Sequence, residues 1–286
     1  MNRILLCTDL DRTLLPNGSQ PESPSARERF RQVAARPELT LAYVTGRHLQ
    51  LIREAIETYE LPVPDYAVGD VGTTIYQARP DGEWQAVEAW QREIAADWGS
   101  LQHDDLAGLL DDIGQLRQQE SNKQNAFKLS YYAPADTDAG GLQEEVTRRL
   151  GAADVRAAVI WSVDESRAIG LLDVLPERAT KLHAIRFLMH ELGCEERQTV
   201  FAGDSGNDLP VLTSGLQAVL VRNAADEVRD AVTQAMRRDG LDGRVYLARG
   251  DFLGLNGHYA GGILEGLAHF RPETEAWMRP GAERSG

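Results

Sequence analysis

The chain has little cysteine and no long hydrophobic run. Its 286 residues include two cysteines, Cys7 in an expected strand and Cys194 after an expected helix, and neither stands at a zinc-binding or redox spacing. This leaves no disulfide framework, as is usual in the reducing cytoplasm. Uncharged runs such as residues 209–221 are too short to span a bilayer, and the N-terminal apolar stretch is too short for a signal peptide. We expect a soluble cytoplasmic protein without a membrane segment.

Basic residues are also scarce relative to acidic ones. The chain has 30 Lys and Arg against 44 Asp and Glu, a formal net charge of −14 and a pI near 4.9. Nucleic acids and anionic membrane surfaces are bound through clustered basic side chains, so neither is an expected partner. An anionic small molecule is not excluded, because a bound cation can reverse the sign of a local field.

Apolar strands and amphipathic helices alternate in both end regions of the chain. Continuous apolar runs predict buried strands, and apolar residues at a period near 3.6 predict helices. This alternation is typical of an α/β fold in which helices cover a Rossmann-like parallel sheet. The expected strands are 4–8, 39–45, 199–203 and 217–221, and the expected helices are 23–37, 48–61, 179–193, 208–215, 224–240 and 260–270.

The middle of the chain has a different order of expected strands and helices. Short alternating segments at 127–133 and 157–163 are separated by helical patterns at 103–119 and 141–150. This is an α+β pattern, and it predicts an inserted domain with a small sheet of its own. We expect residues 1–79 together with 172–286 to form one domain and residues 80–171 to form the insertion.

Two carboxylates follow the first expected strand in the segment CTDLDRTLL, residues 7–15. Asp9 and Asp11 are two residues apart, so both can project to one side at the carboxyl end of a parallel strand. That edge is the usual ligand crevice of an open α/β sheet. An ordinary turn is the alternative interpretation, and the pair alone does not decide between the two.

Three later segments favour a functional site. The segment TGR at 45–47 ends the second expected strand, and GDSGND at 203–208 ends another strand with further carboxylates. Lys181 begins a helix, where its ammonium group supplies a mobile positive charge. Each feature alone is compatible with a turn or a solvated lysine. All four features in this order, with three of them at strand ends when the Asp9 and Asp11 pair is included, are difficult to obtain by chance.

In this order, DLDRT, VTGR, ATK and GDSGND resemble the four motifs of the haloacid dehalogenase superfamily of phosphotransferases. The insertion lies between the second and third motifs, as in members with a large (type C2) cap. The resemblance implies that Asp9 is the nucleophile and that Asp11 is the general acid and base, with a pKa raised by neighbouring carboxylates and the incoming phosphate. It also implies Mg²⁺ bound by Asp9, the Asp11 backbone carbonyl and Asp204, with waters held by Asp208.

The same resemblance implies a set of residues around the transferring phosphoryl group. Thr45, Gly46, Lys181 and Asn207 would surround this group and offset its negative charge. Arg47, beside them, is expected either to contact substrate or to form a salt bridge next to the site.

A narrower set of segments is similar to the sucrose-phosphate phosphatases. The segments are 67–77, 123–132, 171–176, 221–224 and 261–270. In that family the cap carries a QN…FK segment that contacts the sugar, which implies substrate-binding roles for Gln124, Asn125 and Lys128. The chain departs from the family pattern at Lys123, where an acidic residue is usual, and at residues 161–170.

The expected function is therefore Mg²⁺-dependent hydrolysis of sucrose 6-phosphate to sucrose and phosphate, through an aspartyl-phosphate. Phosphatases for mannosyl-3-phosphoglycerate or mannosylfructose phosphate are alternatives, as is a non-catalytic module that binds a sugar phosphate. The expected partner is a small-molecule sugar phosphate, and association with a sucrose-phosphate-synthesising enzyme is a further expectation. Trp84, Trp90 and Trp98 are expected to pack in a core or to form a sugar-stacking platform.

Overall fold

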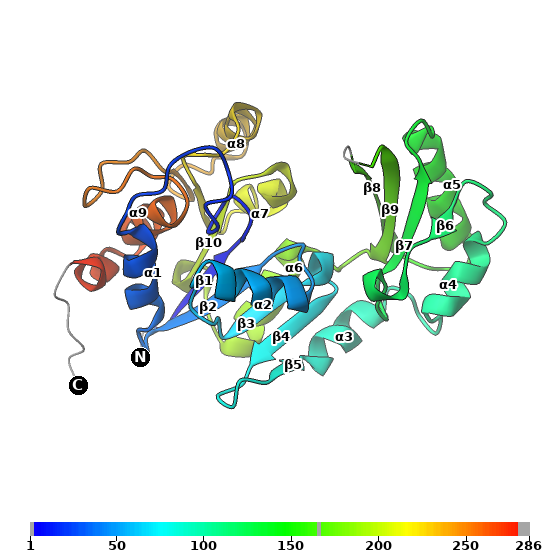
Figure 1. The fold of residues 1–286 in the computed structure, drawn as a ribbon, viewed down its shortest axis with the longest axis horizontal. Coiled ribbons are helices and arrows are strands. Elements are labelled where there is room, and N and C mark those ends of the chain that lie inside the picture. The colour runs from blue at the N-terminus through cyan, green and yellow to red at the C-terminus, as the bar shows by residue number, and fades with distance from the viewer. Residues whose placement is uncertain (1–2, 165–166, 280–286) are drawn as a thin grey trace. The chain divides into compact units, whose positions relative to one another are not determined.

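The computed structural model describes residues 3–164 and 167–279, and it divides into two compact units (Figure 1). The core comprises Met1–Ala86 and Lys181–Gly286, and the cap comprises Val87–Thr180. The chain passes from core to cap after residue 86 and returns after residue 180. Both points come later in the sequence than the expected boundaries at 79/80 and 171/172. The physical reason is strand pairing: residues 84–86 still pair in the core sheet, and residues 169–176 all pair in the cap sheet.

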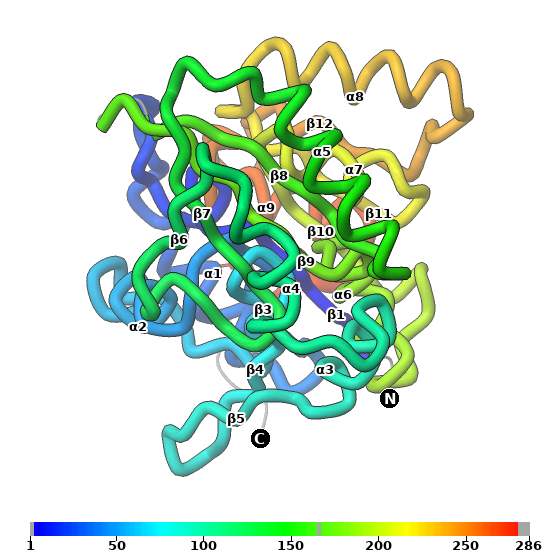
Figure 2. The backbone as a smooth tube through the Cα atoms, turned by 90° about the vertical axis from the view of Figure 1, so that its right-hand side faces the viewer, coloured from blue at the N-terminus to red at the C-terminus, as the bar shows by residue number. Residues whose placement is uncertain are grey.

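The core sheet has eight strands in the order β12-β11-β10-β1-β2-β3-β4-β5. Strands β12 to β3 are parallel, and the edge hairpin β4–β5 is antiparallel. This hairpin and β12 lie at opposite edges of the core sheet (Figure 2). The observed α/β architecture confirms the predicted fold class. The strands are β1 Ile4–Thr8, β2 Leu39–Val44, β3 Tyr66–Gly69, β4 Thr74–Ala78, β5 Trp84–Ala86, β10 Thr199–Gly203, β11 Gln217–Leu220 and β12 Val245–Leu247.

The core helices are shorter than the sequence pattern predicts. The helix expected at 23–37 is α1, Ala26–Ala34, and Ser23 does not cap it, because its hydroxyl accepts a hydrogen bond from the Asn256 N–H at 2.9 Å. At the other end, Pro37 disfavours helical geometry in the preceding residue. The remaining core helices are α2 Leu49–Thr58, α6 Lys181–Leu192, α7 Leu209–Leu212, α8 Asp226–Asp239 and α9 Ala260–Phe270.

One face of the core sheet packs against α1 and α9. Ile4 and Leu6 of β1 lie in a buried cluster with Phe30 of α1 and with Ile263 and Leu267 of α9. These side chains are almost completely inaccessible to solvent, so burying them stabilises the fold by roughly 1.5–3 kcal/mol each. The packed sheet forms a rigid support for the loops that leave the carboxyl ends of its strands.

The cap contains a four-stranded antiparallel sheet in the order β6-β7-β9-β8. One face is covered by helices, with Leu129 and Leu172 in a cluster that also contains Trp98 and Val146. Trp90 and Trp98 are buried, so the core-packing alternative describes both. The cap elements are α3 Glu88–Ala95, α4 His103–Leu110, β6 Arg117–Gln118, β7 Leu129–Pro134, α5 Ala139–Ala152, β8 Ala157–Asp164 and β9 Ile169–Pro176.

The helix expected at 103–119 ends early, at Leu110. Turns and the short strand β6 replace its second half, and Gly114 within that stretch has low helix propensity. The 3-10 segments are η1 Asp70–Gly72, η2 Ser121–Lys123, η3 Glu196–Gln198, η4 Gly206–Asp208 and η5 Pro272–Met278. In the part of the chain that the structure describes, no helix is both long enough and apolar enough to cross a bilayer.

Candidate active site

Three neighbouring parallel strands deliver the predicted site residues to one edge of the core sheet. Strand β1 lies between β10 and β2. Asp9 follows β1, Thr45 follows β2 and Asp204 follows β10. Because the carboxyl ends of parallel strands share an edge, the fold itself brings these residues together.

A buried cluster of carboxylates occupies this edge. Asp9, Asp204 and Asp208 each offer a carboxylate oxygen, and these oxygens all lie within 4.8 Å of one another. All three residues are at most 5% exposed. Three ionised carboxylates that are buried this close together repel one another unless a positive charge lies nearby. Oxygen donors of this kind suit a hard divalent cation such as Mg²⁺.

The turn after β10 is shaped around Asp208. The carboxylate of Asp208 accepts hydrogen bonds from the N–H groups of Asp204 and Ser205, both at 3.1 Å. A Cβ atom at Gly203 would lie 2.7 Å from this carboxylate, so only glycine fits at that position. The turn therefore fixes Asp204 and Asp208 against the end of β10.

Lys181 is the positive charge within the cluster. Its Nζ donates to Asp9 Oδ1 at 3.0 Å, to Asp208 Oδ1 at 2.7 Å and to Asn207 Oδ1 at 3.1 Å. Burial raises the pKa of Asp9 to about 7; the Lys181 ammonium opposes this shift and the Asp208 carboxylate adds to it. One ammonium thus only partly offsets the carboxylates, and the remaining negative charge favours a cation.

Asp204 has two further partners from the loop after β1. The Thr13 hydroxyl donates to Asp204 Oδ1 at 2.9 Å, and the Arg12 guanidinium lies 3.7 Å from Asp204 Oδ2. Burial raises the pKa of Asp204, although the Thr13 hydrogen bond opposes the shift. Thr13 was not predicted, because a threonine inside the motif DLDRT carries no separate signal.

Asp11 is not part of this cluster. Its carboxylate accepts a bidentate pair of hydrogen bonds from Arg47, at 2.7 and 2.6 Å, and one from Asn17 at 2.8 Å. Burial alone would raise the pKa of Asp11, but the hydrogen bonds from Arg47 and Asn17 outweigh it and lower the pKa. Neighbouring carboxylates, which were expected to raise this pKa together with the incoming phosphate, are not among the groups that shift it here. Of the two roles expected for Arg47, the structure shows the salt bridge.

This ion pair predicts a pH-dependent stability difference for Arg47→Gln. A carboxyl whose pKa is lowered by folding stabilises the native state above its unfolded pKa, and this contribution is lost as pH falls through the folded pKa. We expect Arg47→Gln to lower the free energy of unfolding by about 1 kcal/mol at pH 7, since the pair is partly exposed. The difference from wild type should shrink below about pH 4.

Urea unfolding of the metal-free protein at pH 7, 4 and 3 measures this difference. Arg148→Gln is the matched control, because Arg148 pairs with Glu145 on the surface of the cap and is 66% exposed. An Arg47 effect that is the same at every pH would contradict a role for the Asp11 charge.

The expected phosphate-binding residues line the same edge. Thr45 is buried, and its hydroxyl oxygen accepts a hydrogen bond from the Arg47 N–H at 3.3 Å. Gly46 is exposed, and no heavy atom lies within 4 Å of the position a Cβ would take. Asn207 is exposed next to Lys181. An open backbone next to an ammonium group suits the binding of an anionic group.

The predicted sugar contacts lie together in one loop of the cap. The Gln124 amide donates to the carbonyls of Gln119 and Ser130 at 3.0 and 2.9 Å, so it holds the loop together. Asn125 Oδ1 accepts from the Phe127 N–H at 2.8 Å. The Lys128 ammonium lies 3.9 Å from Asp173 on the sheet. Their role toward a sugar stays a prediction.

A sequence profile of the sucrose-6F-phosphate phosphohydrolases matches residues 2–271. The chain belongs to this family. The sucrose-phosphatase from Synechocystis sp. PCC6803, solved with sucrose and phosphate, is similar with a TM-score of 0.69 and 30% identity, over 95% of this chain and 99% of that one. The predicted superfamily and the phosphatase activity are thereby confirmed.

Two relatives extend this comparison. A protein of Nitrosococcus oceani, described as a HAD-like hydrolase, is 58% identical over 283 residues, which is 99% of this chain and 76% of that protein. The mannosylfructose-phosphate phosphatase of Agrobacterium fabrum is 27% identical over 267 residues, which is 93% of this chain and 96% of that protein. The chain is thus a HAD-type sugar phosphatase, and its relatives' names differ in the sugar.

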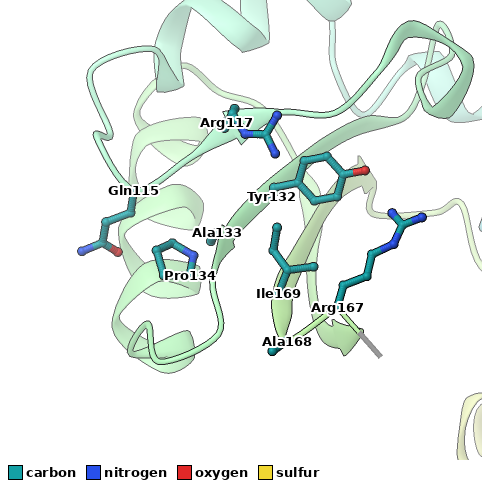
Figure 3. Close-up of a pocket in the computed structure, with 8 residues that line it drawn as sticks. All are labelled: Gln115, Arg117, Tyr132, Ala133, Pro134, Arg167, Ala168 and Ile169. Atoms are coloured by element: carbon teal, nitrogen blue, oxygen red, sulfur yellow. The ribbon is translucent and has the colours of Figure 1, made fainter. Parts of the chain in front are cut away.

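The cap also has a pocket of about 340 Å³ (Figure 3). Arg117 and Arg167 both line it, and the Arg117 guanidinium lies over the Tyr132 ring, 4.7 Å from the centroid. The Tyr132 hydroxyl accepts a hydrogen bond from Lys123 at 2.8 Å. Lys123, where the chain departs from the family pattern, therefore contacts a side chain of this pocket.

Proposed function

We propose that the protein hydrolyses the phosphomonoester of a phosphorylated disaccharide, sucrose 6-phosphate, through an aspartyl-phosphate on Asp9. The observation that supports this most directly is the environment of Asp9. It lies at the end of the central strand β1, bound by Lys181 and clustered with Asp204 and Asp208. A carboxylate nucleophile needs this combination of fixed position and nearby positive charge.

The donor set at this edge fits Mg²⁺. Asp9 and Asp204, with the Asp11 carbonyl, would hold the ion, and Asp208 would bind its waters. Carboxylate and carbonyl oxygens are the ligands that Mg²⁺ prefers, and the cluster carries more negative charge than Lys181 offsets. When bound, the ion would neutralise charge on the transferring phosphoryl group.

The chain's own residues then carry the two chemical steps. A carboxylate oxygen of Asp9 forms a bond to phosphorus while the bond to the sugar oxygen breaks, and Asp11 gives that oxygen its proton. Asp11 next accepts a proton from water as the water oxygen attacks phosphorus and releases phosphate from Asp9. Lys181 and Asn207 hold the phosphoryl oxygens during both steps.

The pairing of Asp11 with Arg47 affects the first of these steps. An ionised Asp11 is suited to accept a proton, and it must be protonated before it can donate one. A guanidinium also binds phosphate in a bidentate manner. We therefore expect the incoming phosphate to compete with Asp11 for Arg47, which would release Asp11 to act as the acid.

The choice of sugar is supported by the family and by the sucrose-phosphatase structure. Mannosylfructose phosphate is the second candidate, because a phosphatase named for it matches nearly the whole chain. A non-catalytic role is not favoured, since the nucleophile, lysine and acidic cluster are all present. Association with a sucrose-phosphate-synthesising enzyme stays a prediction.

A panel of sugar phosphates tests this proposal. Phosphate release is measured with Mg²⁺ for sucrose 6-phosphate, mannosylfructose phosphate, mannosyl-3-phosphoglycerate and glucose 6-phosphate. We expect kcat/KM for sucrose 6-phosphate to exceed that for glucose 6-phosphate by about 10²-fold or more, as expected where contacts to a second sugar contribute a few kcal/mol. A higher kcat/KM for mannosylfructose phosphate would replace sucrose with that sugar, and no turnover of any would reject the function.

A further inference from the structure

Arg12 occupies a strained position between two residues of the site. Its φ is +59°, in the left-handed region that residues with a side chain seldom adopt. Asp11 precedes it and supplies the carbonyl proposed for the metal, and Thr13 follows it and binds Asp204. The conformation of Arg12 thus sets the direction in which both neighbours face.

Two side-chain amides hold Arg12 in this conformation. The Arg12 N–H donates to Asn17 Oδ1 at 2.8 Å, and the Arg12 carbonyl accepts from Asn223 Nδ2 at 2.5 Å. The peptide bond between Asp11 and Arg12 is trans, so the Asp11 carbonyl points away from the Arg12 N–H. Fixing both polar groups of Arg12 therefore also fixes the Asp11 carbonyl.

Asn223 is itself held in one orientation. It is 3% exposed, and its Oδ1 accepts a hydrogen bond from the Tyr259 N–H at 2.9 Å. Tyr259 is fully buried and has a φ of +49° just before α9. Rotating the amide by 180° would place its NH₂ against this N–H and its oxygen against the Arg12 carbonyl. Only the observed orientation satisfies both partners.

This contact links a C-terminal segment to the site. Asn223 lies just beyond β11, and Tyr259 lies in the glycine-rich segment 251–262. Neither segment supplies a side chain to the carboxylate cluster. The Asn223 amide nevertheless connects them to Arg12, 211 positions away along the chain.

We propose that Asn223 is a positioning residue for the phosphoryl-transfer site. It keeps Arg12 in the left-handed conformation, and it thereby fixes the orientation of the Asp11 carbonyl, which would bind the metal, and the contact of the Thr13 hydroxyl with Asp204. This inference rests on the proposed function. It assigns to Asn223 an effect on metal binding and turnover without any contact to substrate.

Asn223→Asp is the most direct test, because the two side chains have the same shape. The new carboxylate can still accept a hydrogen bond from the Tyr259 N–H. At the Arg12 carbonyl, however, a negatively charged oxygen replaces the NH₂ group that donates a hydrogen bond in wild type. We expect the affinity for Mg²⁺, measured by isothermal titration, to fall by about 10- to 100-fold. At saturating Mg²⁺, kcat should fall by a similar factor while KM for the sugar phosphate changes by less than about threefold.

Asn256→Asp is the matched control. The Asn256 amide donates to the Pro21 carbonyl at 2.8 Å and accepts from the His258 N–H at 3.1 Å, so it makes similar contacts in the same C-terminal segment. It has no contact with Arg12 among its hydrogen bonds in the described chain. We expect its Mg²⁺ affinity and kcat to stay within about twofold of wild type.

Asn17→Ala provides a second variant if Asn223→Asp does not fold. Asn17 is exposed and holds the other polar group of Arg12, so its removal should also weaken Mg²⁺ binding. The proposal is overturned if Asn223→Asp binds Mg²⁺ as tightly as wild type, or if Asn256→Asp loses as much. A wild-type protein that neither binds Mg²⁺ nor releases phosphate would instead reject the proposed function.

Discussion

Asp9→Asn is expected to abolish phosphate release and to leave the fold intact. The amide has the shape of the carboxylate but is not a nucleophile, so no aspartyl-phosphate forms. We expect kcat to fall by at least about 10⁴-fold, as is typical when a nucleophile is removed. A fall in KM together with kcat would indicate that the sugar phosphate still binds.

The same substitution should not lower stability in the absence of metal. Asp9 is buried beside Asp208, and burial raises its pKa to about 7. Such a group destabilises the native state increasingly as pH rises towards the folded pKa. Asparagine carries no charge, so the melting temperature of the metal-free variant at pH 8 should equal or exceed that of wild type.

Asp65→Asn is the matched control for Asp9→Asn. Asp65 is an exposed residue just before β3, and its carboxylate accepts a hydrogen bond from the Leu41 N–H at 2.8 Å. It lies at the amino end of its strand, opposite the site. We expect its kcat to match wild type. Residual activity above about 10% in Asp9→Asn, with Mg²⁺ saturating, would remove Asp9 from the nucleophilic role; the expected loss is several orders of magnitude larger.

The strands that carry the site were predictable from the sequence. Strands β1 and β10 have the predicted bounds, and β2 and β11 differ by one residue at their ends. These strands are buried on both faces, so they consist of continuous apolar runs. The strands β4, β5 and β12 were not predicted, because strands of three to five residues with mixed polarity give a weak pattern.

Side-chain pairing within the site was predictable only in part. The motifs identify Asp9, Lys181 and Asp208, and the structure brings these residues into direct contact. Arg47 and Asp11 are 36 positions apart, and their pairing depends on how two loops leave adjacent strands. No periodic pattern in a sequence reports such a contact, so the lowered pKa of Asp11 could be recognised only from the three-dimensional structure.

Lys181→Met is expected to have the second largest effect, because it removes the only ammonium group that contacts the carboxylate cluster in the described chain. The Lys181 side chain is 12% exposed and donates to both Asp9 and Asp208. Methionine has a similar length and no charge. We expect kcat to fall by about 10²–10³-fold or more, since a charged group that stabilises the phosphoryl transfer is lost.

Stability should fall as well, in a manner that depends on pH and on Mg²⁺. Removing one partner of a buried ion pair typically costs about 3–5 kcal/mol, and protonation of Asp9 can relieve part of this cost. Burial raises the pKa of Asp9 and Lys181 opposes the shift, so the pKa should rise further in the variant. A raised pKa of Asp9 in the folded protein stabilises the native state fully below the pKa that Asp9 has in the unfolded chain. This contribution is lost as pH rises through the pKa of Asp9 in the folded protein. The loss should therefore be larger at pH 8 than at pH 6.

Thermal unfolding with and without Mg²⁺ separates this explanation from a general packing defect. A cation restores positive charge to the cluster, so Mg²⁺ should stabilise Lys181→Met at pH 8 at least as much as it stabilises wild type. Lys123→Met is the control, because Lys123 lies in the cap and contacts Tyr132 and Glu120. Its stability should change little with Mg²⁺ beyond the wild-type response. If Lys181→Met were equally destabilised at pH 6 and pH 8 and did not respond to Mg²⁺, the cluster would not be a cation site, because excess negative charge among Asp9, Asp204 and Asp208 requires both dependences.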